Sequence, residues 1–161
     1  MEGAGRICTF QLDHQWFGIA VERVQEVLPV PSITPVPLAP SAVAGLVNLR
    51  GQIVTVIDPR CRLGLPGRPA CLSPVMVVVR SEDAVVGLLA DEIGEVVEAP
   101  PEAFEAAPAN LPVQLQQLVP EVCRIPGHLL HVLDLDAVLR VEAEYGPSRR
   151  RAVKGSRLCA D

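Results

Sequence analysis

Apolar residues along this chain fall in short runs that polar turns separate, which is the pattern of a β protein. The first two runs, 7–12 and 16–21, flank the polar segment Asp13-His14-Gln15 and predict a hairpin. Val21 and Val24 then stand at helical spacing, enough for about one turn. Further strands are predicted over residues 26–30, 53–57, 75–79, 85–90, 95–98, 122–125 and 129–133, and helical turns over 114–118 and 136–139.

Prolines and glycines separate these runs into short pieces. Residues 31–40 contain four prolines, which cannot donate to a strand ladder, so this segment is predicted to be an exposed, stiff connection. Ser41 is expected to cap a turn over residues 42–44. Long loops are predicted from Pro59 to Pro69 and over 99–112.

The composition supports a mainly β fold. The chain has 161 residues, with 49% hydrophobic and only 3% aromatic side chains, so Val, Leu, Ile and Ala must fill the interior. No apolar run approaches the roughly 20 residues of a membrane helix, and the start of the chain does not look like a signal peptide. Five scattered cysteines without a Cys-x-x-Cys pair fit a reducing cytoplasm, with Cys159 as a candidate free thiol.

Charge is distributed unevenly between the body and the end of the chain. Residues 149–161 contain five basic side chains and one acid, a net charge of +4, whereas residues 1–148 contain nine basic and eighteen acidic side chains, a net charge of −9. An acidic body argues against a nucleic-acid surface on the folded domain. Residues 142–161 are expected to form a basic, disordered tail.

Two blocks of the sequence recur in the same order. Residues 18–27 match 87–96 in their glycine, apolar and acidic positions at an offset of 69, and residues 51–58 match 127–134 at an offset of 76. Chance recurrence in a valine-rich β protein is the alternative to duplication. We interpret the blocks as a duplicated β unit that forms two lobes with one continuous core, because about 70 residues are marginal alone.

Candidate chemistry is sparse. His128 and His131 stand three apart on a predicted strand, where their side chains point to opposite faces, so a metal site is not expected. The sequence also lacks a nucleophile motif and a phosphate-binding loop, which argues against an enzyme. Arg50 is different, because an arginine inside apolar sequence needs a carboxylate or solvent.

The segment Asn48-Leu49-Arg50-Gly51, followed by residues 52–58, resembles the CheW family of bacterial chemotaxis coupling proteins. Matching blocks in order and spacing extend the resemblance over about residues 6–141, and they lie at 17–19, 24–27, 86–91 and 127–139. Pro59 and the arginine tail depart from the family pattern. The resemblance implies an all-β domain of two five-stranded SH3-like β-barrels that share a hydrophobic core, without catalysis or a cofactor.

The resemblance also implies two protein partners. A family member links the cytoplasmic hairpin of a methyl-accepting chemoreceptor to the regulatory domain of a CheA-type histidine kinase, in the cytoplasm at membrane-associated receptor arrays. The candidate receptor site comprises Val24, Glu26, Gly45, Asn48, Leu49, Arg50 and Gly51. The candidate kinase face comprises Val77, Val79, Val86 and Leu88 on two predicted strands.

Glu26 is the expected partner of Arg50, because it matches the family acid and a guanidinium can bind one carboxylate through two hydrogen bonds. A purely architectural pair is the alternative to a direct part in receptor binding. Gly45 and Gly51 are candidates for positive φ or close backbone approach, or are ordinary turn glycines, and Asn48 is a candidate to bridge loop amides. The receptor site is expected in the first lobe, which alone carries the arginine.

Two other functions are compatible with the sequence. One is a related adaptor in a chemosensory pathway that controls pili or another output. The other, from a different class, is a small-barrel nucleic-acid-binding protein that uses the basic tail.

Overall fold

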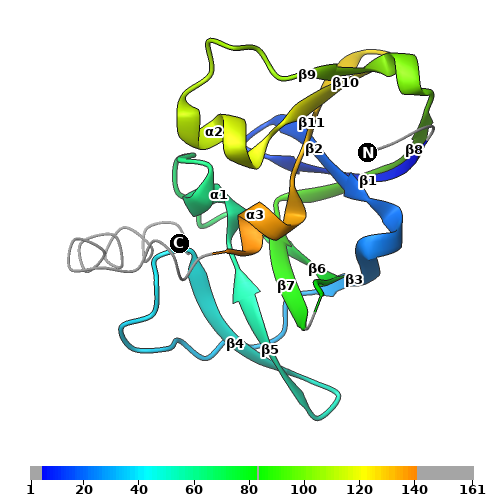
Figure 1. Cartoon of the computed structure of the whole chain (residues 1–161). Helices are drawn as coiled ribbons and strands as arrows, with labels where there is room; N and C mark the ends of the chain where they lie inside the picture. Colours follow the sequence, from blue (N-terminus) through cyan, green and yellow to red (C-terminus); the bar gives the residue numbers. More distant parts are fainter. Residues whose placement is uncertain (1–4, 83, 141–161) are drawn as a thin grey trace.

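The computed structural model describes residues 5–82 and 84–140, which form two β-sheets and short helices (Figure 1). The predicted tail at 142–161 and Cys159 lie outside the described residues. The six-stranded sheet has the order β8 (Glu92–Ala99), β1 (Gly5–Leu12), β2 (Gln15–Ala20), β11 (His128–Val132), β10 (Glu121–Ile125) and β9 (Phe104–Ala106). The five-stranded sheet has the order β3 (Val24–Pro29), β6 (Val75–Arg80), β7 (Val85–Ala90), β5 (Gln52–Ile57) and β4 (Val43–Leu49).

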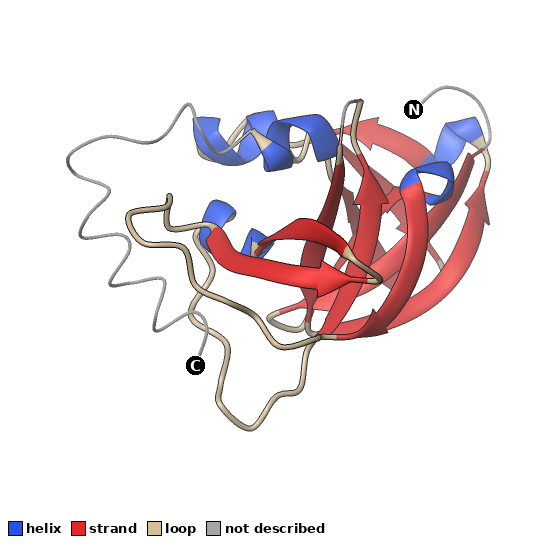
Figure 2. Cartoon of the chain, turned by 90° about the horizontal axis from the view of Figure 1, so that it is seen from below, coloured by secondary structure: helices blue, strands red, loops and turns tan. Residues whose placement is uncertain are grey.

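Short helices connect the strands. They are the 3₁₀ turns η1 (Val21–Arg23) and η2 (Pro101–Ala103) and the α-helices α1 (Pro59–Arg62), α2 (Val113–Leu118) and α3 (Leu135–Leu139). Asp58 caps α1 by accepting a hydrogen bond from the amide of Arg60 at 3.1 Å, and Asp134 caps α3 in the same way through Ala137 at 3.3 Å. Figure 2 shows the strands curling around the interior, with the helices at the margin.

The register of the strands confirms the internal repeat. Each sheet contains one parallel pair, β5 with β7 and β2 with β11. Val56 lies opposite Gly87 in the first pair, and Val132 lies opposite Gly18 in the second. These two contacts are related by the same offsets, 69 and 76, that relate the sequence blocks. The two sheets are therefore built from equivalent strands in an equivalent register.

The halves of the chain are interlocked, because each sheet takes strands from both repeats. β2 belongs to the first half but pairs with β11 of the second half. Arg50 consequently lies in the sheet that spans residues 24–90, which combines the end of one repeat with the start of the next.

Buried apolar residues of the described chain form three clusters. One fills the five-stranded sheet around Val54 and Met76, and another fills the six-stranded sheet around Ile7 and Leu130. The third and largest lies between the sheets and combines residues such as Phe10 with Val77, Leu88 and the helix residue Val138. This shared core confirms the prediction of two β units around a common interior.

Some elements differ from the sequence predictions. The larger sheet has six strands rather than five, because β9 adds to its edge within a segment predicted as loop. β4 replaces the predicted turn and loop, and α1 begins at Pro59 where a long loop was expected. Cys8 and Cys123 are buried, as small core residues should be, whereas Cys71 is exposed.

Gly45 allows the proline-rich connection to lie against β4. Thr34 and Leu46 exchange two backbone hydrogen bonds of 2.8 Å, which join the connection after β3 to β4. A Cβ at Gly45 would run into the Thr34 carbonyl, and Gly45 has a φ of +150°. The prediction that Gly45 permits close backbone approach is confirmed.

Gly45→Ala should therefore destabilise the fold by about 3 kcal/mol, through steric overlap with Thr34 and backbone strain. Gly64→Ala is the matched control, because Gly64 has a φ of +73° but open space around its Cβ position, so only about 1 kcal/mol is expected. Urea unfolding of both variants measures the difference. Equal losses would contradict the role assigned to the Thr34 contact.

Candidate functional site

The hairpin that joins β4 to β5 presents the predicted receptor residues. Leu49 pairs with Gln52, which leaves Arg50 and Gly51 as a two-residue loop with φ values of +54° and +86°. Positive φ at both positions matches the twist of the flanking strands. Asn48 Oδ1 accepts a hydrogen bond of 2.8 Å from the Gly51 amide. The predictions of a positive φ at Gly51 and of an Asn48 bridge are both confirmed.

Arg50 binds Glu26 with two parallel hydrogen bonds. Nη1 donates to Oε2 and Nη2 donates to Oε1, each at 2.6 Å. Glu26 lies on β3 and Arg50 follows β4, which are the outer strands of the five-stranded sheet. The ion pair therefore joins the two edges of this sheet, as the Thr34–Leu46 bridge does further along. The predicted pairing of Arg50 with Glu26 is confirmed.

The pair is accessible to a partner. The Arg50 side chain is 68% exposed and the Glu26 side chain 26% exposed. Hydrogen bonds from Arg50 lower the pKa of Glu26 below its ordinary value, so the carboxylate stays charged. Solvent-exposed ion pairs of this kind contribute little to stability, because water screens the attraction. The geometry fixes a guanidinium at the tip of a hairpin without being a main source of fold stability.

The structure separates the other predicted receptor residues into exposed and supporting ones. Asn48, Arg50 and Gly51 are exposed at the hairpin tip. Leu49 is only 7% exposed and packs in the core of the five-stranded sheet. Val24 is half-buried and packs against the shared core. Leu49 and Val24 therefore position the surface rather than form it.

Most members of the predicted kinase face are buried in the structure. Val77, Val79 and Leu88 are at most 1% exposed and face the shared core, and Val86 is half-buried against the same cluster. β6 and β7 are inner strands with partners on both sides. Neither their backbones nor these valines offer a contact surface.

A buried network of four charges was missed from the sequence. Arg60 and Asp91 form hydrogen bonds of 3.2 and 2.6 Å, and Arg68 binds Asp91 at 2.9 Å and Asp58 at 3.0 Å. Arg60 and Arg68 are only 2% and 4% exposed. The network ties the loop after α1 to the turn between β7 and β8. The signal available in the sequence was three arginines in the proline-rich segment from Pro59 to Pro69.

Burial and charge act differently on the two carboxylates. Burial raises the pKa of Asp58 despite the opposing charge of Arg68. Burial also opposes the charge of Asp91, but hydrogen bonds from Arg60, the Asp13 amide and Arg68 hold its pKa below the ordinary value. The arginines are therefore essential to keep charge in this interior.

Metal and membrane sites are not evident in the part of the chain that the structure describes. Residues 5–82 and 84–140 contain no cluster of three His, Cys, Asp or Glu side chains that could hold a metal ion. His131 instead contacts the Trp16 carbonyl through Nδ1 at 2.9 Å. No helix in the same residues combines the length and apolar character needed to cross a membrane.

Titration of Glu26 tests the electrostatics of the hairpin. We expect its pKa, measured by carboxyl NMR, to lie below that of a free glutamate and to rise toward the ordinary value in Arg50→Ala. A lowered folded-state pKa adds stability that is present above the unfolded-state pKa and is lost as the pH falls through the folded-state pKa. An unchanged Glu26 pKa in Arg50→Ala would contradict the pairing.

Removal of one buried arginine should lower the free energy of unfolding far more than removal of an exposed one. Arg68→Ala leaves Asp58 buried without its guanidinium partner, so we expect a loss of about 3 kcal/mol in urea unfolding. Arg80→Ala, which removes an exposed contact to Gln25, is the control and should change stability by less than about 0.5 kcal/mol. Similar losses in the two variants would contradict the structural role of the network.

Comparison with known proteins identifies the family. The family model for the CheW-like domain matches residues 6–143. The chain is 26% identical over 140 residues to the chemotaxis protein CheW of Rhizobium meliloti, covering 87% of this chain and 90% of the relative. It is 29% identical over 136 residues to the chemotaxis protein CheW of Treponema pallidum, covering 81% and 79% of the two chains.

The fold is also found in a solved structure. The scaffolding protein TtCheW from Thermoanaerobacter tengcongensis superposes with a TM-score of 0.78 at 24% identity, covering 89% of this chain and 97% of that protein. The family predicted from the Asn48–Asp58 segment is confirmed. The chain belongs to the CheW family, the non-enzymatic scaffold proteins of chemotaxis signalling.

Proposed function

We propose that this chain couples the cytoplasmic hairpin of a chemoreceptor to the regulatory domain of a CheA-type histidine kinase, with the β4–β5 hairpin tip as the receptor contact. The main support for the proposal is that Arg50, at an exposed hairpin, forms two hydrogen bonds with Glu26. The protein would act in the cytoplasm at membrane-associated receptor arrays.

The chemistry of the hairpin tip suits recognition. Arg50 is held in one orientation by Glu26, so less side-chain entropy is lost when a partner binds. Exposed apolar side chains stand close by in the sequence: Val27, 41% exposed, follows Glu26 on β3, and Ile53, 63% exposed, lies three residues after Arg50 on β5. A fixed guanidinium with apolar neighbours fits a helical partner that presents both carboxylate or carbonyl acceptors and apolar side chains.

A contact with the kinase requires exposed residues. The valines of β6 and β7 are buried, so they do not meet this requirement. We assign the kinase contact to the outer face of the six-stranded sheet, where Val96 on β8 is 47% exposed and Leu129 on β11 is 48% exposed. These residues are the repeat counterparts of Val27 and Ile53 at the offsets of 69 and 76. Two equivalent apolar surfaces on one rigid domain would allow an adaptor to hold two partners at once.

The assignment of receptor and kinase to two different surfaces can be tested by measuring the binding of each partner to variants of each surface. In pull-down and titration with a receptor hairpin, Arg50→Ala and Glu26→Ala should each weaken binding by about tenfold, because the oriented guanidinium is lost. Kinase binding should be retained in both. Leu129→Ser should show the reverse pattern, with weaker kinase binding and intact receptor binding.

Arg124→Ala is the matched control, because Arg124 is also an exposed, ion-paired arginine, on the β10–β11 hairpin of the other sheet. It should leave receptor binding unchanged. The exchange Glu26→Arg with Arg50→Glu separates direct recognition from architecture, since it preserves the ion pair but moves the guanidinium. Full receptor binding by the exchanged variant would assign the pair a purely architectural role, and full binding by Arg50→Ala would contradict the proposed site.

A further inference from the structure

The six-stranded sheet has a cavity where the five-stranded sheet has the Arg50–Glu26 pair. The cavity has a volume of about 640 Å³, and its lining includes Trp16, Glu95, Glu98, Pro126 and His128. It lies between β8 and the turn that joins β10 to β11. Trp16, Val97 and Ile125 line the cavity and also pack against the buried cluster that contains Ile7 and Leu130.

The repeat relates this cavity to the receptor site. Glu95 is the counterpart of Glu26 at the offset of 69, and Pro126 is the counterpart of Arg50 at the offset of 76. The pairing of β3 with β6 is irregular between Val24 and Glu26, and that of β1 with β8 is irregular at the matching place. The two glutamates thus follow equivalent backbones. In one sheet the carboxylate binds a guanidinium from the hairpin, and in the other a proline replaces that arginine.

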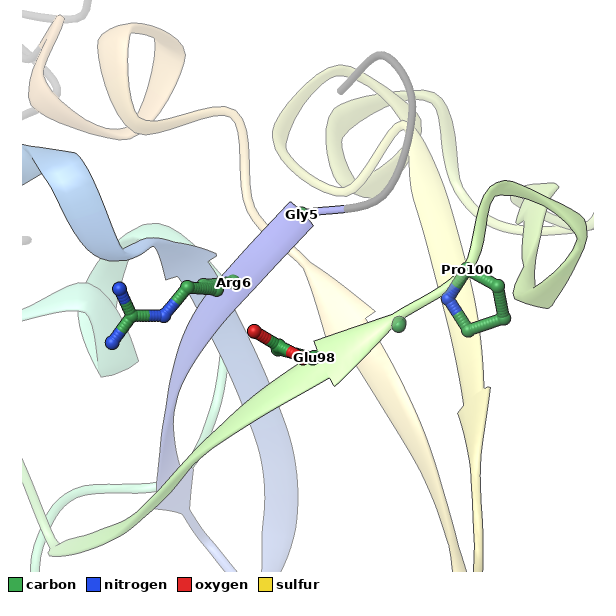
Figure 3. Close-up of a pocket in the computed structure, with 5 residues that line it drawn as sticks. Gly5, Arg6, Glu98 and Pro100 are labelled. Carbon is green, nitrogen blue, oxygen red and sulfur yellow. The ribbon is translucent and has the colours of Figure 1, made fainter.

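Within the described residues, no cation pairs with the carboxylates of the cavity. Arg124, on the adjacent hairpin, is bound to Glu105 instead. Arg6 lies opposite Glu98 in the strand register, but Figure 3 shows that its guanidinium extends away from the Glu98 carboxylate. Glu95 and Glu98 therefore leave a negative site that lacks the partner its counterpart has.

Aromatic rings complete the chemistry of the cavity. Trp16 and His128 have ring centroids 5.0 Å apart, at an interplanar angle of 44°. A Cβ at Gly94 would overlap the Trp16 ring, so the glycine leaves room for the indole at this place. A carboxylate next to an indole is the environment that favours an arginine side chain, through a charged hydrogen bond and a cation–π contact.

We propose that the arginines at positions 149–151 of this chain dock in the cavity, where one guanidinium binds Glu95 as Arg50 binds Glu26. The three arginines belong to a segment of net charge +4, which complements a body of net charge −9. They begin nine residues after Arg140, the last described residue. Nine extended residues reach roughly 30 Å. Laid end to end, β11, α3 and the link between them could separate His128 from Arg140 by at most about the same distance.

The single tryptophan makes the site directly observable, because Trp16 is the chain's one source of an indole N–H resonance and of tryptophan fluorescence. In the full-length chain we expect Trp16 to be protected from acrylamide quenching. Changing all three arginines to glutamine should remove the protection and move the indole resonance. In a Glu95→Gln background the same triple change should have no further effect, since both changes remove one contact.

A peptide of residues 146–158 can then be added to the chain that carries the three glutamine substitutions, and its binding is followed by the fluorescence of Trp16. Glu95→Gln should weaken peptide binding by about tenfold, whereas Glu22→Gln, which removes an equal charge from η1, should leave it unchanged. A peptide with lysine at the three positions should bind more weakly, because lysine cannot form the paired hydrogen bonds. Equal quenching in the natural and triple glutamine chains, or equal peptide affinity for the Glu95→Gln and Glu22→Gln chains, would overturn the proposal.

Discussion

Two parallel strand pairs, one in each sheet, hold the fold together by locking the halves of the chain into one another. Gly18 opposite Val132 and Gly87 opposite Val56 set the same register in both sheets. Side chains at these glycines would overlap Ile7 and Met76. Each sheet therefore needs strands from both ends of its sequence block, and the shared core between the sheets forms only when both are complete. The result is two sheets that share one core and have equivalent ends.

The two ends differ in one charged contact, and this difference makes the surfaces at the two ends chemically distinct. Arg50 bound to Glu26 closes the end of the five-stranded sheet, while Pro126 leaves the equivalent end of the six-stranded sheet open around Glu95. A symmetric scaffold with unequal ends can present different chemistry to different partners. The charge network of Asp58, Arg60, Arg68 and Asp91, in which all but Asp91 are buried, instead supports the fold between α1 and β8.

Much of the fold and the central pair could be predicted from the sequence, because strand periodicity, the repeat and the need of Arg50 for a carboxylate are local signals. β4 could not, since Gly45 and Asn48 interrupt an apolar run in a way that also describes a loop. The valines of β6 were expected at the surface, but alternate residues of this strand face two different buried clusters. Val77 lies in the core shared by the sheets, and Met76 lies in the cluster of the five-stranded sheet. The buried charge network depends on contacts across 23 and 31 residues, which no local pattern reveals.

We propose that a chemoreceptor recognises the tip of the β4–β5 hairpin. Hydrogen–deuterium exchange of the full chain, measured with and without a receptor hairpin, locates the contact because it reports the protection of each segment separately. We expect slower exchange over residues 45–53 and around Glu26 when the receptor is bound, with unchanged exchange at the equivalent hairpin over 124–129. Slower exchange confined to 124–129 or to another surface, with 45–53 unaffected, would contradict the proposal.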